Sequence, residues 1–208
     1  MKNKVLLRSS FIALFAAIIS VGSLIKIPLG PVPIVLQNAL CVFSGILLGG
    51  VYGGAPTALF LAAGLIGLPI YSGGTGGFGV WAGPTGGFLL GYLLAAVVAG
   101  FIAGRPDVSE KVPNKSTIFR VILAFAVGIV IMYVPGVLWF ARWAAMNSKV
   151  PESKTLLSFT LGACVLPFIP GDCIKIALFF PIALKIRPLV AQYLQFEPRK
   201  GDEVDSGK

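Results

Sequence analysis

Residues 86–104 read GGFLLGYLLAAVVAGFIAG, a run of 19 residues without a charged side chain. An α-helix needs about 20 mostly apolar residues to cross the hydrocarbon core of a bilayer. Small residues recur at every fourth position of this run, at Gly87, Gly91, Ala95, Ala99 and Ala103. Such a ridge lets two helix backbones approach closely and pack by dispersion. The run therefore predicts a membrane-spanning helix that packs against a neighbour.

The rest of the chain has the composition of a polytopic membrane protein. Its mean hydropathy is +0.90, and charged residues make up 12% of the sequence, against about 25% in ordinary soluble domains. Six apolar runs predict membrane helices at residues 8–25, 36–50, 53–69, 86–104, 119–140 and 171–190. The second and third runs are short, which predicts tilting, kinking or partial re-entry, and residues 156–168 predict an extra short helix. We expect an all-α polytopic fold, with one six-helix membrane domain over 1–190 and a polar cytoplasmic tail over 191–208.

The basic residues orient this bundle. With six spans, one side of the membrane carries both termini and the second and fourth loops, and that side holds 12 of the 17 lysines and arginines. The other side holds four, and Lys175 lies within the last span. Because cytoplasmic loops are rich in Lys and Arg, both termini are predicted to be cytoplasmic, in a multi-pass protein of the cell membrane. The same topology explains the net charge of +9 without a nucleic-acid partner.

The residues that usually carry enzymatic and metal chemistry are scarce. The sequence has no histidine, the commonest metal ligand and a frequent general base. Its three cysteines, Cys41, Cys164 and Cys173, lie among apolar neighbours without the spacing of a metal site. No nucleophile–base pair stands out, and no phosphate-binding loop of the type G-x-x-x-x-G-K-S/T is present. We therefore expect no enzyme activity and no metal or other cofactor.

Two loops on the predicted outer side are unusually apolar. The first, KIPLGPVPIVLQN at 26–38, contains three prolines, which hold the backbone extended. The third, YSGGTGGFGVWAGPTGG at 71–87, contains eight glycines, three aromatic residues and no charge. Irregular backbone at membrane depth is tolerated where protein or a cavity covers it, and glycine lets a ligand approach the main chain. A flexible surface loop is the alternative interpretation of 71–87.

Asp172 and Lys175 lie in PFIPGDCIKIALFF, residues 167–180, one of the most apolar stretches of the chain. Because Pro170 and Gly171 break the chain, a helix is predicted to begin near Asp172. Residues three apart share a helix face, and each charge costs ~2.5–3.5 kcal/mol at mid-membrane. The two side chains are therefore predicted to face a cavity or each other. The structural alternative makes Asp172 an N-cap, with or without an ion pair, but a cap contributes only about 1 kcal/mol and leaves the lysine unexplained.

Three motifs, in this order along the chain, resemble the BioY family, the biotin-binding membrane subunits (S-components) of energy-coupling-factor (ECF) transporters. They are GPVPIVLQN at 30–38, GLPIYSGGTGGFGVWAGPTGGFLLGYLLAA at 67–96 and LPFIPGDCIKI at 166–176. The resemblance implies a six-helix S-component that captures biotin from outside under a lid of the first and third loops. It also implies that a small-residue motif, here Ala13 and Ala17, meets a coupling transmembrane subunit, and that two separate ATPase subunits power uptake. From the residues alone, that ridge is equally an internal helix contact.

For biotin, whose ureido ring and carboxylate flank an apolar middle, the charged pair becomes a candidate binding site. We assign Lys175 to the carboxylate and Asp172 to the ureido N–H groups, or both side chains to one end of the ligand. Gln37 and its neighbour Asn38 either bind the ligand or cap the second helix. The remaining candidates are two loop glycines and four aromatic residues: Gly74, Gly76, Phe78, Trp81, Tyr92 and Tyr133. The alternative for the four aromatic residues is a role as interface anchors or in packing. The alternative functions are an S-component for another vitamin and a stand-alone membrane carrier, and the sequence leaves a homo-oligomer open.

Overall fold

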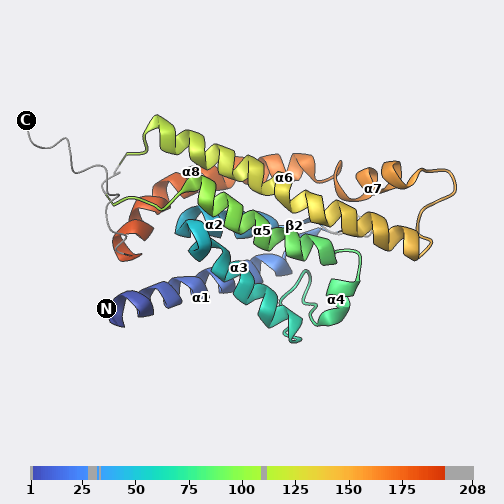
Figure 1. The fold of residues 1–208 in the computed structure, drawn as a ribbon, viewed down its shortest axis with the longest axis horizontal. Coiled ribbons are helices and arrows are strands. Elements are labelled where there is room, and N and C mark those ends of the chain that lie inside the picture. Colours follow the sequence, from blue (N-terminus) through green and yellow to red (C-terminus); the bar gives the residue numbers. More distant parts are fainter. Residues whose placement is uncertain (1, 28–31, 33, 109–111, 195–208) are drawn as a thin grey trace, which may run out of the picture.

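The computed structural model describes the chain except for residues 1, 28–31, 33, 109–111 and 195–208. The described part is mostly helical, with a short two-stranded sheet (Figure 1). The elements are α1 (Lys2–Leu24), β1 (Lys26–Ile27), β2 (Ile34–Val35), α2 (Gln37–Leu48), α3 (Gly50–Leu65), α4 (Phe78–Ala82), α5 (Gly86–Ala103), α6 (Lys115–Met146), α7 (Leu156–Cys164) and α8 (Ile169–Leu194). Most of the predicted tail, from residue 195 onward, lies outside the described residues.

Each predicted span corresponds to a helix, so the all-α class is confirmed. Four segments are long and apolar enough to cross a membrane: α1, α5, α6 and the α7–α8 segment. The helices α2 and α3 have only 12 and 16 residues, as short as their sequences predict. α6 has 32 residues and begins earlier than predicted, because Asn114 caps it by accepting a 2.8 Å hydrogen bond from the Thr117 backbone N–H. Six membrane crossings with cytoplasmic termini stay a prediction.

The two ends of the chain's helical part lie together. Figure 1 shows α1 beginning, in blue, at the same end of the bundle where α8 finishes, in red. The short helix α4 lies at the opposite end. This arrangement is the one that an even number of membrane crossings produces.

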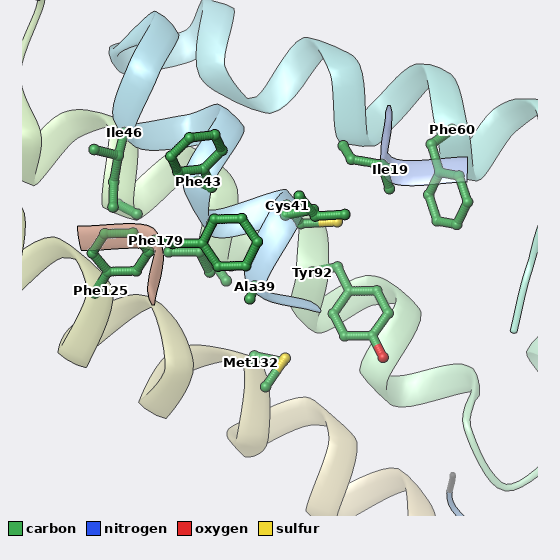
Figure 2. Close-up of a cluster of buried hydrophobic side chains, with 14 of the residues drawn as sticks. Ile19, Ala39, Cys41, Phe43, Ile46, Phe60, Tyr92, Phe125, Met132 and Phe179 are labelled. Atoms are coloured by element: carbon green, nitrogen blue, oxygen red, sulfur yellow. The ribbon is translucent and has the colours of Figure 1, made fainter. Parts of the chain in front are cut away.

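α2 forms the centre of the bundle. All of its residues are buried, and it packs against α1, α3, α5, α6 and α8. Figure 2 shows Phe43 of α2 beside Phe179 of α8, and the two ring centroids are 5.1 Å apart. α2 also meets α5 through backbone, because a Cβ added to Gly45 would fall on the carbonyl oxygen of Ala96.

The two small-residue ridges have different roles. On α5, Gly91, Ala95 and Ala99 are buried, and a Cβ added to Gly91 would meet the backbone of Met132 in α6. The predicted internal packing of this ridge is therefore confirmed. On α1, the ridge of Ser9, Ala13 and Ala17 is exposed. Only 22% of the α1 span is buried against 61% of the α5 span, so most of α1 remains open to lipid or to another protein.

Arg187 has a structural position that the charge count did not reveal. The predicted topology places Arg187 among the basic residues of the cytoplasmic side. In the structure it is a buried residue of α8, with 5% of its surface exposed. Its guanidinium donates to the carbonyl oxygens of Ile46, Ala103 (2.9 Å) and Gly104 (3.2 Å). These carbonyls end α2 and α5, where helices lack internal donors and favour a cation. Arg187 thus fastens α8 to the ends of both helices.

Candidate ligand-binding site

The charged pair of α8 is present and buried. α8 begins at Ile169, three residues before Asp172, so this carboxylate lies in the first turn rather than at an N-cap. The ammonium nitrogen Nζ of Lys175 is 2.9 Å from Oδ1 of Asp172. The two residues are 8% and 3% exposed. The two side chains share a helix face as predicted, and of the two predicted arrangements, facing a cavity or facing each other, they face each other.

Two further side chains complete what we call the polar cluster, formed by Asn38, Tyr133, Asp172 and Lys175. Asn38, in the first turn of α2, donates through Nδ2 to Oδ1 of Asp172 (3.0 Å) and accepts through Oδ1 from Nζ of Lys175 (2.9 Å). Tyr133 of α6 donates its hydroxyl to Oδ2 of Asp172 over 2.5 Å. The Ala39 backbone N–H donates to Oδ1 of Asn38 over 2.8 Å, which fixes the amide orientation. The cluster thereby joins α2, α6 and α8.

The polar cluster is neutral but keeps an open donor. An ammonium has three donors, and Lys175 uses two of them on described residues, Asn38 and Asp172. Desolvating a buried ion pair costs several kcal/mol per ion, a cost that well-packed apolar side chains would avoid. Ionisable residues kept inside a membrane domain despite that cost usually mark a functional site. The open donor of Lys175 suits an anionic or carbonyl group of a ligand.

A narrow cavity adjoins the polar cluster. It encloses about 330 Å³, its open mouth included, and its walls are Val32, Val35, Gln37, Tyr71, Ser72, Val80, Thr85, Phe88, Leu89 and Tyr92. The Phe88 ring lies 6.2 Å from the Tyr133 ring, centroid to centroid. The polar cluster therefore lies behind the cavity wall, on the far side of Phe88.

Gln37 contributes an unpaired acceptor to the cavity wall. Its side chain is 2% exposed, and its Oε1 atom has no hydrogen-bond partner. Its amide lies beside the hydroxyl of Tyr92, which Figure 2 shows pointing away from the packed rings of Phe43 and Phe179. Leu36 occupies the N-cap position of α2, so Gln37 does not cap the helix. Because buried polar atoms nearly always have partners, this acceptor is suited to an N–H donor of a ligand.

The glycine-rich loop is fastened to the bundle at its first residue. Tyr71 is fully buried, donates its hydroxyl to the Leu61 carbonyl over 2.5 Å and accepts from Nε1 of Trp81 over 2.9 Å. Burial raises the pKa of the Tyr71 phenol above its usual value, which keeps it a hydroxyl donor. Gly73, with φ of 69°, donates its N–H to the Ser23 carbonyl over 3.1 Å. These hydrogen bonds to α1 and α3 make the loop an ordered part of the fold rather than a flexible surface segment.

The predicted site residues fall into four groups. Gln37 and Tyr92 line the cavity. Three others, Tyr133, Asp172 and Lys175, belong to the polar cluster. Gly74 is exposed in a turn with φ of 78°, and Gly76 packs against the backbone of Leu68. Phe78 (74% exposed) and Trp81 do not line the cavity; they line a separate groove. No group of potential metal ligands occurs in the described residues.

Asn38 is the residue whose predicted role changes most once the structure is known. From the sequence it stands only beside Gln37, as a ligand contact or a helix cap, whereas in the fold it bonds both charged residues of α8. A signal for it exists in the sequence, because a polar residue inside a predicted span needs a polar partner. Phe88 and Thr85 of the cavity wall lack any such signal, since they follow the composition of the surrounding loop and helix.

Comparison with known proteins identifies the family. The model of the BioY family matches residues 1–192. The chain belongs to the BioY family. The biotin transporter BioY of Rhodobacter capsulatus is 40% identical over 187 residues, which cover 88% of this chain and 93% of that protein. The biotin transporter BioY of Lactococcus lactis subsp. cremoris is 35% identical over 188 residues, which cover 89% and 92% of the two chains.

A solved structure agrees with this family assignment. The crystal structure of the S-component for biotin from an ECF-type ABC transporter superposes with a TM-score of 0.72 at 32% identity, and the match covers 90% of this chain and 94% of that one. The resemblance that three sequence motifs indicate is therefore confirmed over nearly the whole fold. These BioY relatives are transport proteins, in line with the expectation that the chain is not an enzyme.

Proposed function

We propose that this BioY chain is the biotin-binding S-component of an ECF transporter, a multi-pass protein of the cell membrane that captures biotin from the outer side. The observation that carries the proposal is the polar cluster with an open donor beside a cavity that holds an unpaired acceptor. Biotin has polar groups at both ends and an apolar middle. A cavity whose wall combines polar groups with the apolar side chains of Val35, Phe88 and Leu89 suits such a ligand.

The contact between Asp172 and Lys175 restricts how biotin lies in the site. Their charged atoms are 2.9 Å apart, so the two ends of an extended ligand do not reach the pair at the same time. The unpaired Oε1 of Gln37 accepts an N–H group but repels a carboxylate. We therefore place the ureido ring in the cavity at Gln37 and the carboxylate at Lys175. Asp172 then contacts the ureido ring only in the reverse pose.

We further propose that the first and third loops form the lid over biotin. Both contribute to the same cavity wall, the first through Val32 and Val35 and the third through Tyr71 and Ser72. The first loop is paired into a hairpin, with Lys26 opposite Val35 in the register of β1 and β2. Apolar lid residues exclude water from the ligand's middle when they close over it.

Calorimetry on the detergent-purified chain tests this function. We expect saturable binding of biotin and no heat of binding with thiamine, riboflavin or folate, because the site's polar groups are matched to one ligand and rejected ligands leave them unpaired. Preferential binding of another vitamin would keep the assignment as an S-component but would show that biotin is not the substrate. Failure of a folded preparation to bind any of the four would contradict the proposal.

We also propose that the exposed ridge of α1 docks onto a coupling transmembrane subunit that works with two ATPase subunits. Ala13 and Ala17 lie on the open face of α1, and small side chains let a partner helix approach closely. We expect the double variant Ala13→Leu, Ala17→Leu to lose co-purification with a co-expressed coupling subunit and ATPase pair while it still binds biotin. The matched control is Ala62→Leu, at an exposed position of α3. Intact co-purification of the double variant would move the docking face elsewhere.

A further inference from the structure

A second concave site lies on the opposite side of α4 from the cavity. This lateral groove is bounded by α4, α5 and the last turns of α6, and it encloses about 1440 Å³ together with its open side. Its walls include Phe78, Leu138 and Met146, which are 74%, 68% and 73% exposed. All three tryptophans of the chain, Trp81, Trp139 and Trp143, line it. Nothing in the proposed biotin site uses this groove.

The groove has the length and the polarity of one membrane leaflet. Along α6 its lining runs from Pro135 to Asn147, a length of roughly 18 Å at 1.5 Å per residue. The hydrocarbon part of one leaflet is about 15 Å deep. The lining is apolar over most of this length; Arg142 lies just past its middle, with Trp143 and Met146 beyond it, and Asn147 is at its end. In the predicted orientation this end lies at the outer surface of the membrane.

Arg142 is the one charged residue of the lining, and it is exposed. Within the part of the chain that the structure describes, no carboxylate pairs with it, since Lys175 and Asp172 form the ion pair found there. A cation in the wall of an apolar groove complements an anionic headgroup attached to an acyl chain. Basic pockets between membrane helices bind lipid headgroups for this reason. Snorkelling of a lone arginine to the interface explains the charge, but it does not explain the groove beneath it.

We propose that the lateral groove binds an anionic phospholipid of the outer leaflet, with an acyl chain along the tryptophans and the phosphate at Arg142. The bound lipid lies against the back of α4. Val80 of that helix lines the cavity on one side, and Trp81 lines the groove while bonded to Tyr71. The lipid therefore contacts the same short helix that forms part of the cavity wall.

Tryptophan fluorescence tests the proposal without labelling, because every tryptophan of the chain lies in the groove. The full chain in detergent is titrated with phosphatidylglycerol whose acyl chains carry bromine, a contact quencher. We expect saturable quenching, and we expect Arg142→Gln to raise the half-saturating lipid concentration about fivefold, the effect of one basic side chain near a lipid surface. Brominated diacylglycerol, which lacks the phosphate, is expected to quench the two proteins equally.

The matched control is Lys149→Gln, which removes an exposed cation from the same end of the molecule but outside the groove lining. Its half-saturating concentration is expected to equal that of the wild type. Quenching that grows linearly without saturation and is the same in all variants would overturn the proposal in favour of simple interfacial anchoring. Reversal of the quenching by one equivalent of biotin would assign the groove to biotin, and loss of quenching on dimerisation would assign it to a second copy of the chain.

Discussion

Lys175→Ala is expected to weaken biotin binding about 10- to 100-fold in calorimetry on the detergent-purified chain. Hydrogen bonds to charged groups contribute about 1.5–3 kcal/mol, and each 1.4 kcal/mol changes the affinity tenfold. Lys175 is the single basic residue of the polar cluster and has one donor left for a ligand. The matched control is Lys185→Ala, on the same helix but at an exposed position, which is expected to bind biotin like the wild type.

Loss of Lys175 also leaves Asp172 without its counter-charge, so the variant must be separated from a folding defect. Removing one partner of a buried pair destabilises a protein by about 3–5 kcal/mol, whereas replacing both partners is far less costly. The double variant Asp172→Asn, Lys175→Met removes both charges at similar volume. We expect it to remain folded and to bind biotin as poorly as Lys175→Ala. A folded Lys175 variant with wild-type affinity would return this lysine to a purely structural role.

A ligand comparison identifies the end of biotin that meets Lys175. Biotin amide keeps the ureido ring but has no carboxylate charge. If Lys175 pairs with the carboxylate, the wild type loses affinity for the amide, and Lys175→Ala binds biotin and the amide equally. Undiminished binding of the amide by the wild type would place the ureido ring at the polar cluster instead, with Asp172 as its acceptor.

The sequence predicted the helices and the charged pair because both follow from local patterns. Apolar runs of span length determine the helices, and residues three apart on a helix share a face wherever the helix lies. The residues that bond to this pair could not be predicted in the same way. Asn38 is 134 residues from Asp172 and Tyr133 is 39 residues away, and no local pattern indicates that three helices bring them together.

The sequence also left undecided which apolar surfaces face protein and which face lipid. The ridges of α1 and α5 have the same four-residue spacing, yet Ala17 is exposed and Ala99 is buried. Lipid tails are as apolar as leucine, so hydropathy does not separate a lipid-facing residue from a core residue. The same limit applies to Phe78 and Trp81, which sequence reasoning placed around the ligand and the structure places in the lateral groove.

Gly45→Ala is expected to destabilise the bundle by about 2 kcal/mol or more. Overpacking a tight contact costs about 1–3 kcal/mol when the surroundings relax. Here the new Cβ would fall on the carbonyl oxygen of Ala96, which is backbone and does not rotate away. Thermal unfolding in detergent, followed by circular dichroism, measures the change.

The backbone around Gly45 has little freedom to relieve the clash, because three helices meet there. A Cβ on Gly53 of α3 would contact the backbone of Gly45, and one on Gly100 of α5 would contact the carbonyls of Gly45 and Gly50. A shift of α2 away from α5 would also pull on the polar cluster, since Asn38 lies on the same helix. The matched control is Gly162→Ala in α7, where an added Cβ meets nothing within 4 Å. Because alanine is the better helix former by about 1 kcal/mol, this control is expected to be neutral or stabilising, and equal stability of the two variants would contradict the close approach of α2 and α5.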